Sequence, residues 1–472
     1  MKKYLPLLVI PLLSPIAAPA IDQEPLADSL TFHNPPAPLT PNAKYEDWPR
    51  FLGPNDDASS AEIPLAFPKT NTPPPIVWEL QKGAGYAGPS VAGGKLFLFH
   101  RLDENEVLEC RNPETGTLLW SHHNPVEYRD RYGFSPGPRA APVIDKNRVY
   151  TLGVTGHLAC HDTASGELIW SREINSEYHV PTYFFGTGPS PLVHQNKLIL
   201  NVGGREPEDN GVCVIALDKL NGETLWETRD PWGASYASPI IASLHNRDRL
   251  LVFAGGESKP ATGGLLCIDP DSGKVFDRFP WRADKYESVN ASTPIVLPDN
   301  RVFISECYQL GGVLLEYDEN ARSSVVWEAP AFGMHWMTPL LVDGVIYGFS
   351  GRNEPDALLS CYDATTGTER WREDLSWRKV IDGRNFGWGF FRGSLLQTPE
   401  LTIALGELGT LAIFELTPNG LEIPYQTDLF FARETWTLPV LYKGLLYVCQ
   451  NTPDVISNAP PRLLCYSLRP SE

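Results

Sequence analysis

The sequence contains no long uninterrupted hydrophobic run and is short of positive charge. No window offers the eighteen or more apolar residues that a membrane-spanning helix needs, so no transmembrane segment is predicted. Lys and Arg number 39 against 57 Asp and Glu, which gives a formal net charge of −18. An acidic surface repels phosphate backbones and anionic lipid headgroups, and nucleic acid is therefore not expected as a partner.

The sequence also lacks the short motifs of several enzyme classes. It has no H-E-x-x-H, no G-x-S-x-G between a strand and a helix, and no phosphate-binding loop of Walker type. Its 10 histidines show no ligand-like spacing beyond the neighbours His122 and His123. We interpret these two as a solvated pair in a connection rather than a metal site. No residue is assigned a catalytic role and no metal site is predicted.

The first 75 residues differ in composition from the remainder. Residues 1–20, "MKKYLPLLVIPLLSPIAAPA", have two lysines, a short apolar run and a small-residue end, which predicts a signal peptide cleaved after Ala20. We therefore expect a periplasmic or secreted protein. Residues 21–75 carry twelve prolines, too many for sheet or helix, and are predicted to form a linker followed by a strap.

One eleven-residue phrase recurs along the chain. It reads "CRNPETGTLLW" from Cys110, "CHDTASGELIW" from Cys160, "ALDKLNGETLW" from Ala216 and "CYDATTGTERW" from Cys361, with an altered copy "CIDPDSGKVFD" from Cys267. An apolar residue ends one strand, Asp or Asn bonds to the turn backbone, Gly takes positive φ and the next strand runs to Trp. The phrase predicts a β-hairpin.

A second hairpin precedes each phrase and begins at a proline followed by apolar residues. These prolines are Pro89, Pro142, Pro191, Pro239, Pro294, Pro339 and Pro439. Two hairpins make a four-stranded antiparallel unit, and one divergent unit without its proline lies in the last gap. The count of eight units predicts an all-β, eight-bladed β-propeller spanning residues 76–472. Residues 76–80, "IVWEL", should pair with residues 462–468, so that an N-terminal strand closes the last blade.

The repeated Trp and Gly residues are predicted to be scaffold. We expect inter-blade packing for Trp78, Trp120, Trp170, Trp226, Trp327 and Trp371, and turn positions for Gly116, Gly166, Gly222, Gly273 and Gly367. Five cysteines occupy equivalent repeat positions far apart in space, and we interpret them as small buried hydrophobic residues: Cys110, Cys160, Cys267, Cys361 and Cys465. The pairing state of Cys213, Cys307 and Cys449 is left open.

The phrase A-x-D-x-x-T-G-x-x-x-W resembles the repeat of pyrroloquinoline quinone (PQQ) type propellers. Residues 45–468 resemble exported PQQ-binding-like β-propeller repeat proteins of planctomycete and verrucomicrobial type, with matches at "WPRFLGPNDD", "YRDRYGFSPGPRAAPV" and "GGVLLEYDE". The same architecture serves quinoprotein alcohol dehydrogenases and the outer-membrane assembly scaffold BamB. The resemblance therefore implies the fold more firmly than a function.

A quinoprotein dehydrogenase is the alternative function that the resemblance raises. Such enzymes place two adjacent cysteines over the cofactor, bind calcium through a carboxylate and amide set, and often add a C-x-x-C-H haem segment. This sequence has neither cysteine motif, and no calcium set can be assigned. No cofactor is predicted, and PQQ with calcium is retained as the alternative.

The strand starts nearest the propeller axis define a candidate ligand-binding face. Shortly before the prolines lie large polar or aromatic residues: Tyr86, Arg139, Tyr236, Asn290, His335, Trp336 and Trp436. Loops expected on the same face add Arg205, Glu306 and Glu407. These side chains either bind a ligand or plug the axis, and residues 383–396, rich in Gly and aromatics, either form a pocket wall or pack a divergent blade.

The leading hypothesis from the sequence is a non-enzymatic module that binds a ligand or scaffolds a partner through this face. A small molecule, a sugar or a protein could be the partner, since a concave site combines apolar walls with a few polar groups. We expect a monomer. A PQQ-dependent oxidoreductase of alcohols or sugars is the first alternative, and a polysaccharide-active enzyme the second.

Overall fold

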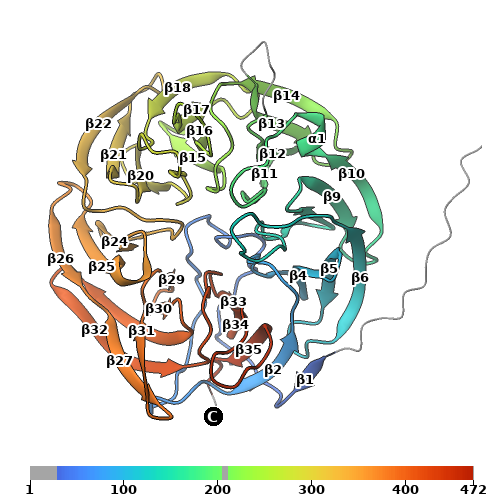
Figure 1. Ribbon diagram of the computed structural model, residues 1–472, viewed down its shortest axis with the longest axis vertical. Coiled ribbons are helices and arrows are strands. Elements are labelled where there is room, and N and C mark those ends of the chain that lie inside the picture. Colours follow the sequence, from blue (N-terminus) through green and yellow to red (C-terminus); the bar gives the residue numbers. More distant parts are fainter. Residues whose placement is uncertain (1–28, 205–210, 471–472) are drawn as a thin grey trace, which may run out of the picture.

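The computed structural model describes residues 29–204 and 211–470, and these form a ring of eight four-stranded antiparallel blades (Figure 1). The predicted eight-bladed β-propeller is thus confirmed. Within the described residues the only helical elements are α1 (Ile174–Glu177) and the 3-10 turn η1 (Glu354–Asp356). No helix of this part of the chain is long and apolar enough to cross a membrane. The predicted signal peptide lies outside the described residues.

The first four blades follow one another in sequence, each running from the axis outward. Blade 1 has β3 (Ser90–Ala92), β4 (Lys95–Leu102), β5 (Asn105–Arg111) and β6 (Leu118–Pro125). Blade 2 has β7 (Val143–Asp145), β8 (Arg148–Leu152), β9 (His157–Asp162) and β10 (Leu168–Glu173). Blade 3 has β11 (Leu192–His194), β12 (Lys197–Asn201), β13 (Val212–Asp218) and β14 (Thr224–Arg229). Blade 4 has β15 (Ile240–Leu244), β16 (Arg247–Ala254), β17 (Gly264–Ile268) and β18 (Val275–Pro280).

The next three blades continue the same meander. Blade 5 has β19 (Ile295–Leu297), β20 (Arg301–Glu306), β21 (Gly311–Tyr317) and β22 (Ser323–Ala329). Blade 6 has β23 (Leu340–Val342), β24 (Val345–Ser350), β25 (Leu358–Asp363) and β26 (Glu369–Glu373). Blade 7, the divergent unit, is complete with β29 (Ser394–Gln397), β30 (Thr402–Leu405), β31 (Thr410–Thr417) and β32 (Gly420–Asp428).

Blade 8 closes the ring by joining the two ends of the chain. It contains β33 (Val440–Tyr442), β34 (Leu445–Gln450) and β35 (Arg462–Ser467), followed by β2 (Ile76–Gln81) and β1 (Leu30–Phe32). β2 pairs antiparallel with β35, as predicted. β1 adds a fifth strand that we did not expect in a proline-rich segment; residues 30–32 contain no proline and can therefore pair with residues 78–80.

Five of the six repeated Trp residues join two neighbouring blades by packing on a Gly of the next one. Trp120 of blade 1 lies over Gly166 of blade 2, where a Cβ atom would come 2.6 Å from the indole ring. The pairs Trp78–Gly116, Trp170–Gly222, Trp226–Gly273 and Trp327–Gly367 repeat this contact. The indole N–H of all six repeat Trp residues donates to a backbone carbonyl of the following blade. The phrase is therefore an inter-blade joint.

The altered phrase replaces its Trp by Asp277 and makes a different joint. The Asp277 carboxylate accepts hydrogen bonds from the backbone N–H (3.1 Å) and hydroxyl (2.5 Å) of Ser323 in blade 5. A polar contact thus takes the place of the indole packing between blades 4 and 5.

All eight cysteines lie in the described residues and are free thiols. The five repeat cysteines are buried, and so are Cys213 and Cys449, whereas Cys307 is half-buried. Burial raises the pKa of the Cys110 and Cys160 thiols to about 12. These thiols pack as apolar side chains.

A two-stranded hairpin, β27 (Ser376–Ile381) and β28 (Arg384–Gly389), stands between blades 6 and 7 outside the four-strand pattern. Trp388 on this hairpin stacks on Phe431 with ring centroids 4.2 Å apart and donates to the Thr410 hydroxyl at 2.8 Å. The aromatic residues that follow blade 6 therefore attach an inserted hairpin to the following blades.

The segment Trp48–Asp57 crosses the centre of the ring (Figure 1). The Trp48 and Val91 backbones bond to each other, and the Pro49 carbonyl accepts from the Ile144 N–H at 2.8 Å. Phe51 of this segment contacts the central pocket described below. The predicted strap thus supplies part of the lining of that pocket.

Candidate functional site

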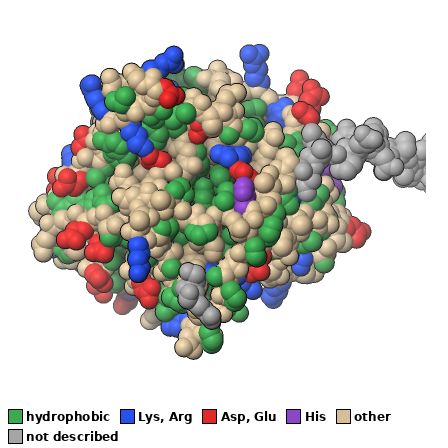
Figure 2. Space-filling model, turned by 90° about the horizontal axis from the view of Figure 1, so that it is seen from below, with side chains coloured by type: hydrophobic (Ala, Val, Ile, Leu, Met, Phe, Trp, Pro, Cys, Tyr) green, Lys and Arg blue, Asp and Glu red, His purple; other side chains and the backbone are tan. Residues whose placement is uncertain are grey.

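A pocket of about 490 Å³ lies at the centre of the ring. Its lining consists of Phe51, Tyr86, Phe134, Arg139, Phe185, Gly188, Ser190, Tyr236, Ser238, Val289, Ala291, His335, Trp336, Glu354, Arg392, Arg433, Glu434 and Trp436. Seen from the side, the ring carries acidic and basic side chains scattered between hydrophobic ones, with no extended patch of one sign on that face (Figure 2). Four other cavities in the described residues hold only about 10 to 30 Å³ each.

The register of the inner strands explains which residues surround the pocket. The residue three positions before each of the seven repeat prolines lines it in every case: Tyr86, Arg139, Gly188, Tyr236, Ala291, Trp336 and Trp436. Five of these positions carry large side chains, whereas Gly188 and Ala291 are small. The ring of aromatic residues therefore does not fill the axis, and space remains beside blades 3 and 5.

The remaining predicted residues take different places. His335 lines the pocket, but Asn290 is fully buried behind it and donates to the carbonyls of Ala254 (2.7 Å) and Trp281 (3.0 Å). Glu306 is buried and accepts from the backbone N–H groups of Tyr308 and Leu310, which fixes its own loop. Arg205 lies outside the described residues.

Aromatic side chains form a continuous belt along the pocket wall. Trp436 contacts Tyr86, Trp336 and Phe134, with ring centroids 5.1, 4.8 and 5.7 Å away. The belt continues through Phe134 and Phe185 (5.5 Å) to Tyr236 (5.7 Å). These ring planes are tilted by 37° to 77°, so both faces and edges are presented.

Two arginines of the lining are neutralised by carboxylates. Arg139 bonds to Asp130 at 3.0 Å, and Arg392 bonds to Glu407, with Nε 2.9 Å from Oε2. Glu407 is fully buried and also accepts from the Trp436 indole N–H at 2.6 Å. Glu407 therefore lies behind the wall and orients Arg392 and Trp436.

Glu434 is a pocket carboxylate with a different environment. Tyr86 donates its hydroxyl proton to Glu434 Oε2 at 2.5 Å, and the same hydroxyl accepts from the Ser135 N–H at 3.2 Å. Partial burial raises the pKa of Glu434 above its ordinary value, and the Tyr86 hydrogen bond opposes this rise. Its backbone has φ of +60°, a conformation that costs a non-glycine residue energy and that clusters at functional sites.

His335 is held as a neutral imidazole in the pocket lining, next to Trp336. Burial lowers its pKa to about 3, and the positive charges of Arg392 and Arg352 act in the same direction. Its Nε2 lies 3.0 Å from the Tyr308 hydroxyl. The imidazole therefore contributes a neutral polar surface to the pocket.

Sequence reasoning missed several lining residues, and some signals for them exist. Ser190 and Ser238 directly precede two of the repeat prolines, so the register argument could have included them. Arg392 lies in the Gly-rich and aromatic stretch of residues 383–396, which therefore contributes a pocket residue as well as packing the inserted hairpin. Phe134 and Phe185 come from long connections, where no periodicity indicates direction.

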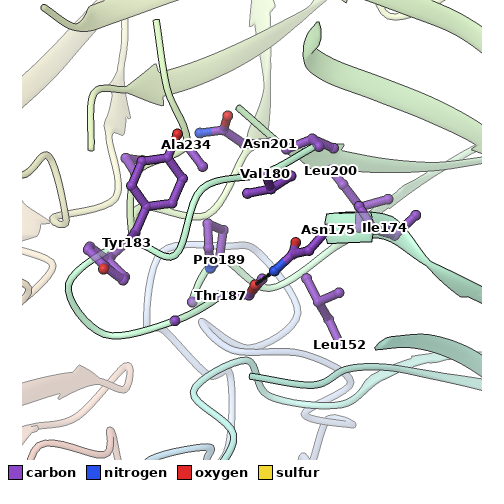
Figure 3. A pocket seen from close by; sticks show the side chains of 15 residues that line it. Leu152, Ile174, Asn175, Val180, Tyr183, Thr187, Pro189, Leu200, Asn201 and Ala234 are labelled. Carbon is purple, nitrogen blue, oxygen red and sulfur yellow. Dashed lines mark hydrogen bonds between the residues drawn. The ribbon is translucent and has the colours of Figure 1, made fainter. Parts of the chain in front are cut away.

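A second, much smaller cavity lies between blades 2 and 3 (Figure 3). It holds about 20 Å³ and is crossed by a hydrogen bond from the Asn175 amide to the Thr187 hydroxyl at 2.9 Å. This space is enough for one water molecule but not for a ligand.

The adjacent histidines lie in strand β6 and not in a connection, which corrects our expectation. His123 is exposed, whereas the His122 ring packs 4.4 Å from the His161 ring of blade 2. Burial lowers the pKa of His161 to about 3. Across the described residues no group of three His, Cys, Asp or Glu side chains is arranged to hold a metal ion.

The ring of eight blades with its repeated Trp–Gly joints defines a PQQ-like β-propeller. The chain belongs to the family described as outer membrane protein assembly factor BamB, whose profile matches residues 103–373.

Individual relatives are distant. Over 137 residues the chain is 30% identical to the BamB of Moranella endobia (strain PCIT). This matched region is 29% of this chain and 28% of that protein. Over 216 residues it is 26% identical to the BamB of Yersinia pestis, covering 46% of each. A polyvinylalcohol dehydrogenase of a Pseudomonas species is 23% identical over 259 residues, 51% of this chain and 36% of that enzyme. The chain thus spans less than half the length of each of these relatives in the matched regions.

Solved structures share the fold at low sequence identity. The quinohemoprotein alcohol dehydrogenase of Comamonas testosteroni has a TM-score of 0.60 at 14% identity, covering 90% of this chain and 81% of the other. A europium-containing methanol dehydrogenase has a TM-score of 0.61 at 13% identity, covering 89% of this chain and 98% of the other. BamB of Moraxella catarrhalis has a TM-score of 0.53 at 13% identity, covering 84% of this chain and 98% of the other.

Proposed function

We propose that the protein is a non-enzymatic binding module that works outside the cytoplasm and takes a small ligand in the central pocket. The observation that carries this proposal is the pocket itself. Its volume of about 490 Å³ falls within the range of about 300 to 1,000 Å³ that is typical of ligand sites. An apolar aromatic wall with a few placed Arg and Glu side chains also fits a binding site better than a plugged axis.

Family membership supports a scaffolding role in addition to ligand binding, because the family is described as an outer membrane protein assembly factor. The predicted signal peptide supports a location in the periplasm or outside the cell. In this proposal the ligand occupies the pocket, and a protein partner would contact the loops around its mouth.

A quinoprotein-type oxidoreductase is the alternative, and the residues present fit its cofactor poorly. The carboxylates of PQQ require cationic partners, but Arg139 and Arg392 already bind Asp130 and Glu407. A calcium ion requires a set of six to eight oxygen ligands, whereas the only carboxylates among the lining residues are Glu354 and Glu434, and Glu434 is bound to the Tyr86 hydroxyl. We therefore derive no oxidation step.

The first test measures binding of a neutral aromatic probe, 2-(1-naphthyl)ethanol, by isothermal titration calorimetry. Ala291→Trp places a large ring at a position where two other blades carry Trp, so it should fill the pocket without disturbing the fold. We expect this variant to lose binding. Val296→Trp on the half-exposed strand β19 is the matched control and should bind normally.

A parallel titration with PQQ and calcium tests the alternative on protein first stripped with EDTA. A ligand present at one hundred times its dissociation constant stabilises the folded state by about 2.7 kcal/mol, which is visible in a melting curve. A calcium-dependent rise in the midpoint that Ala291→Trp abolishes would favour the oxidoreductase. Unchanged melting together with probe binding would favour the binding module.

A further inference from the structure

The charges around the pocket are not balanced evenly. Arg139 and Arg392 each have a carboxylate partner, so neither presents a net positive charge to a ligand. The partner of Glu434 is instead the neutral Tyr86 hydroxyl. No cationic side chain of the described residues forms an ion pair with Glu434. Its second oxygen, Oε1, accepts no hydrogen bond from these residues. One carboxylate oxygen is therefore available to a ligand.

Neighbouring cations act on Glu434 at a distance but form no ion pair with it. Arg433 is adjacent in sequence but exposed, so solvent screens it. Arg392 is held by Glu407, and Glu354 lies 3.9 Å from Arg392 as a further carboxylate. The lining contains three arginines and two glutamates, Glu354 and Glu434. Asp130 and Glu407, which pair with two of the arginines from behind the wall, bring the number of carboxylates to four. The pocket thus carries a net negative charge.

Rings of the aromatic belt already hold cations of the chain, since the guanidinium of Arg139 lies 5.6 Å from the Tyr86 ring centroid and that of Arg392 lies 5.4 Å from the Trp436 ring centroid. Aromatic faces attract ammonium groups, most strongly where water is excluded. Tyr86 and Trp436 are in contact, and the Tyr86 hydroxyl is bonded to Glu434. The formal charge of −18 adds attraction at long range for a positively charged ligand. Further along the belt Phe134 and Phe185, with Val289 and Ala291, form an apolar wall.

Resting on the proposed binding function, we propose that the ligand is a cationic amine with an aromatic or apolar body. Glu434 accepts a hydrogen bond from the ammonium group, the Tyr86 hydroxyl orients the carboxylate, and the Phe134–Phe185 wall contacts the body. Glu434 is thus the residue that determines specificity for charge.

The experiment compares three probes with the same ring system on the full chain: 2-(1-naphthyl)ethylamine, 2-(1-naphthyl)ethanol and 1-naphthylacetate. Calorimetry at pH 7.5 should rank the amine tightest and the acetate weakest. Loss of a hydrogen bond to a charged group corresponds to roughly a ten- to hundredfold change in affinity. We therefore expect Glu434→Gln to weaken amine binding by about that factor and to change alcohol binding by less than about twofold.

Glu415→Gln removes one negative charge from an exposed position on strand β31 and is the matched control. It should leave the affinity for the amine unchanged, which separates the pocket contact from general attraction by an acidic protein. Tyr86→Phe, which keeps the ring but not the hydroxyl, should weaken the amine by less than Glu434→Gln does.

Equal binding of all three probes, or tighter binding of the acetate, would overturn the charge preference while leaving the binding function in place. Amine binding that survives Glu434→Gln would overturn the assignment of Glu434. Binding of all probes that persists in Ala291→Trp would instead refute the proposed function, because the probes would then occupy another site. Failure of all three probes to bind would refute both.

Discussion

The Trp–Gly joint between blades can be tested with two glycines that share one backbone conformation. Gly166 and Gly344 both have φ of +77°. A Cβ atom at Gly166 would meet the Trp120 ring at 2.6 Å, whereas a Cβ atom at Gly344 would meet nothing within 4 Å. Comparing Gly166→Ala with Gly344→Ala therefore isolates the contact with the indole ring from the backbone strain.

The expected magnitudes follow from these two terms. A left-handed conformation costs an L-residue about 1–2 kcal/mol, and reduced freedom of the unfolded chain returns about 0.4–1 kcal/mol. This net cost should be the same at both positions, about 1 kcal/mol. Overpacking adds about 1–3 kcal/mol at Gly166 alone, because Trp120 is held by its hydrogen bond to the Thr163 carbonyl at 3.2 Å.

Urea unfolding measures the difference, since a lower midpoint at unchanged slope reports a loss of stability. Gly166→Ala should have the lower midpoint. The double variant Trp120→Ala/Gly166→Ala should cost less than the sum of the two single changes, because the clash disappears with the ring. Equal losses for Gly166→Ala and Gly344→Ala, or additive costs in the double variant, would refute the role of the joint.

Further predictions concern protonation and thiols. Binding of the naphthyl amine should weaken as pH falls through the raised pKa of Glu434, and this loss should begin at a higher pH than for an ordinary glutamate. The groups facing this carboxylate are Tyr86, Glu407, Arg392 and Arg433. Calorimetry between pH 4 and pH 8 checks the prediction. Burial lowers the pKa of His161 to about 3, so as pH falls the unfolded state protonates this imidazole before the folded state does. The contribution of His161 to stability should therefore be fully present above pH about 6.5 and decline as pH falls toward 3. His161→Phe should flatten this decline in urea unfolding. Ellman's reagent should titrate eight thiols per chain in denaturant without reductant, whereas the native protein should react slowly, first at half-buried Cys307.

Much of the scaffold could be predicted because it repeats. A strand pattern that recurs in eight units, with Gly at a fixed position in five of them and Trp in six, averages out local ambiguity. The closing strand followed from one unpaired half-unit at each end. Strand β1 and the inserted hairpin β27–β28 escaped prediction because neither belongs to the repeat. The histidine pair was misplaced for a related reason, since the outer strand β6 runs on past the point where its repeat phrase ends.

The sequence by itself determined the blade, the joints and the ring of positions three residues before each proline, since period and turn chemistry are local properties. Tertiary structure alone decided what that ring encloses. Small residues at Gly188 and Ala291 leave space that the large ring members do not fill, and the strap brings Phe51 into the lining. The environment of Glu434 was also decided there, because its partner Tyr86 lies 348 residues away in the chain and meets it only when the ring closes.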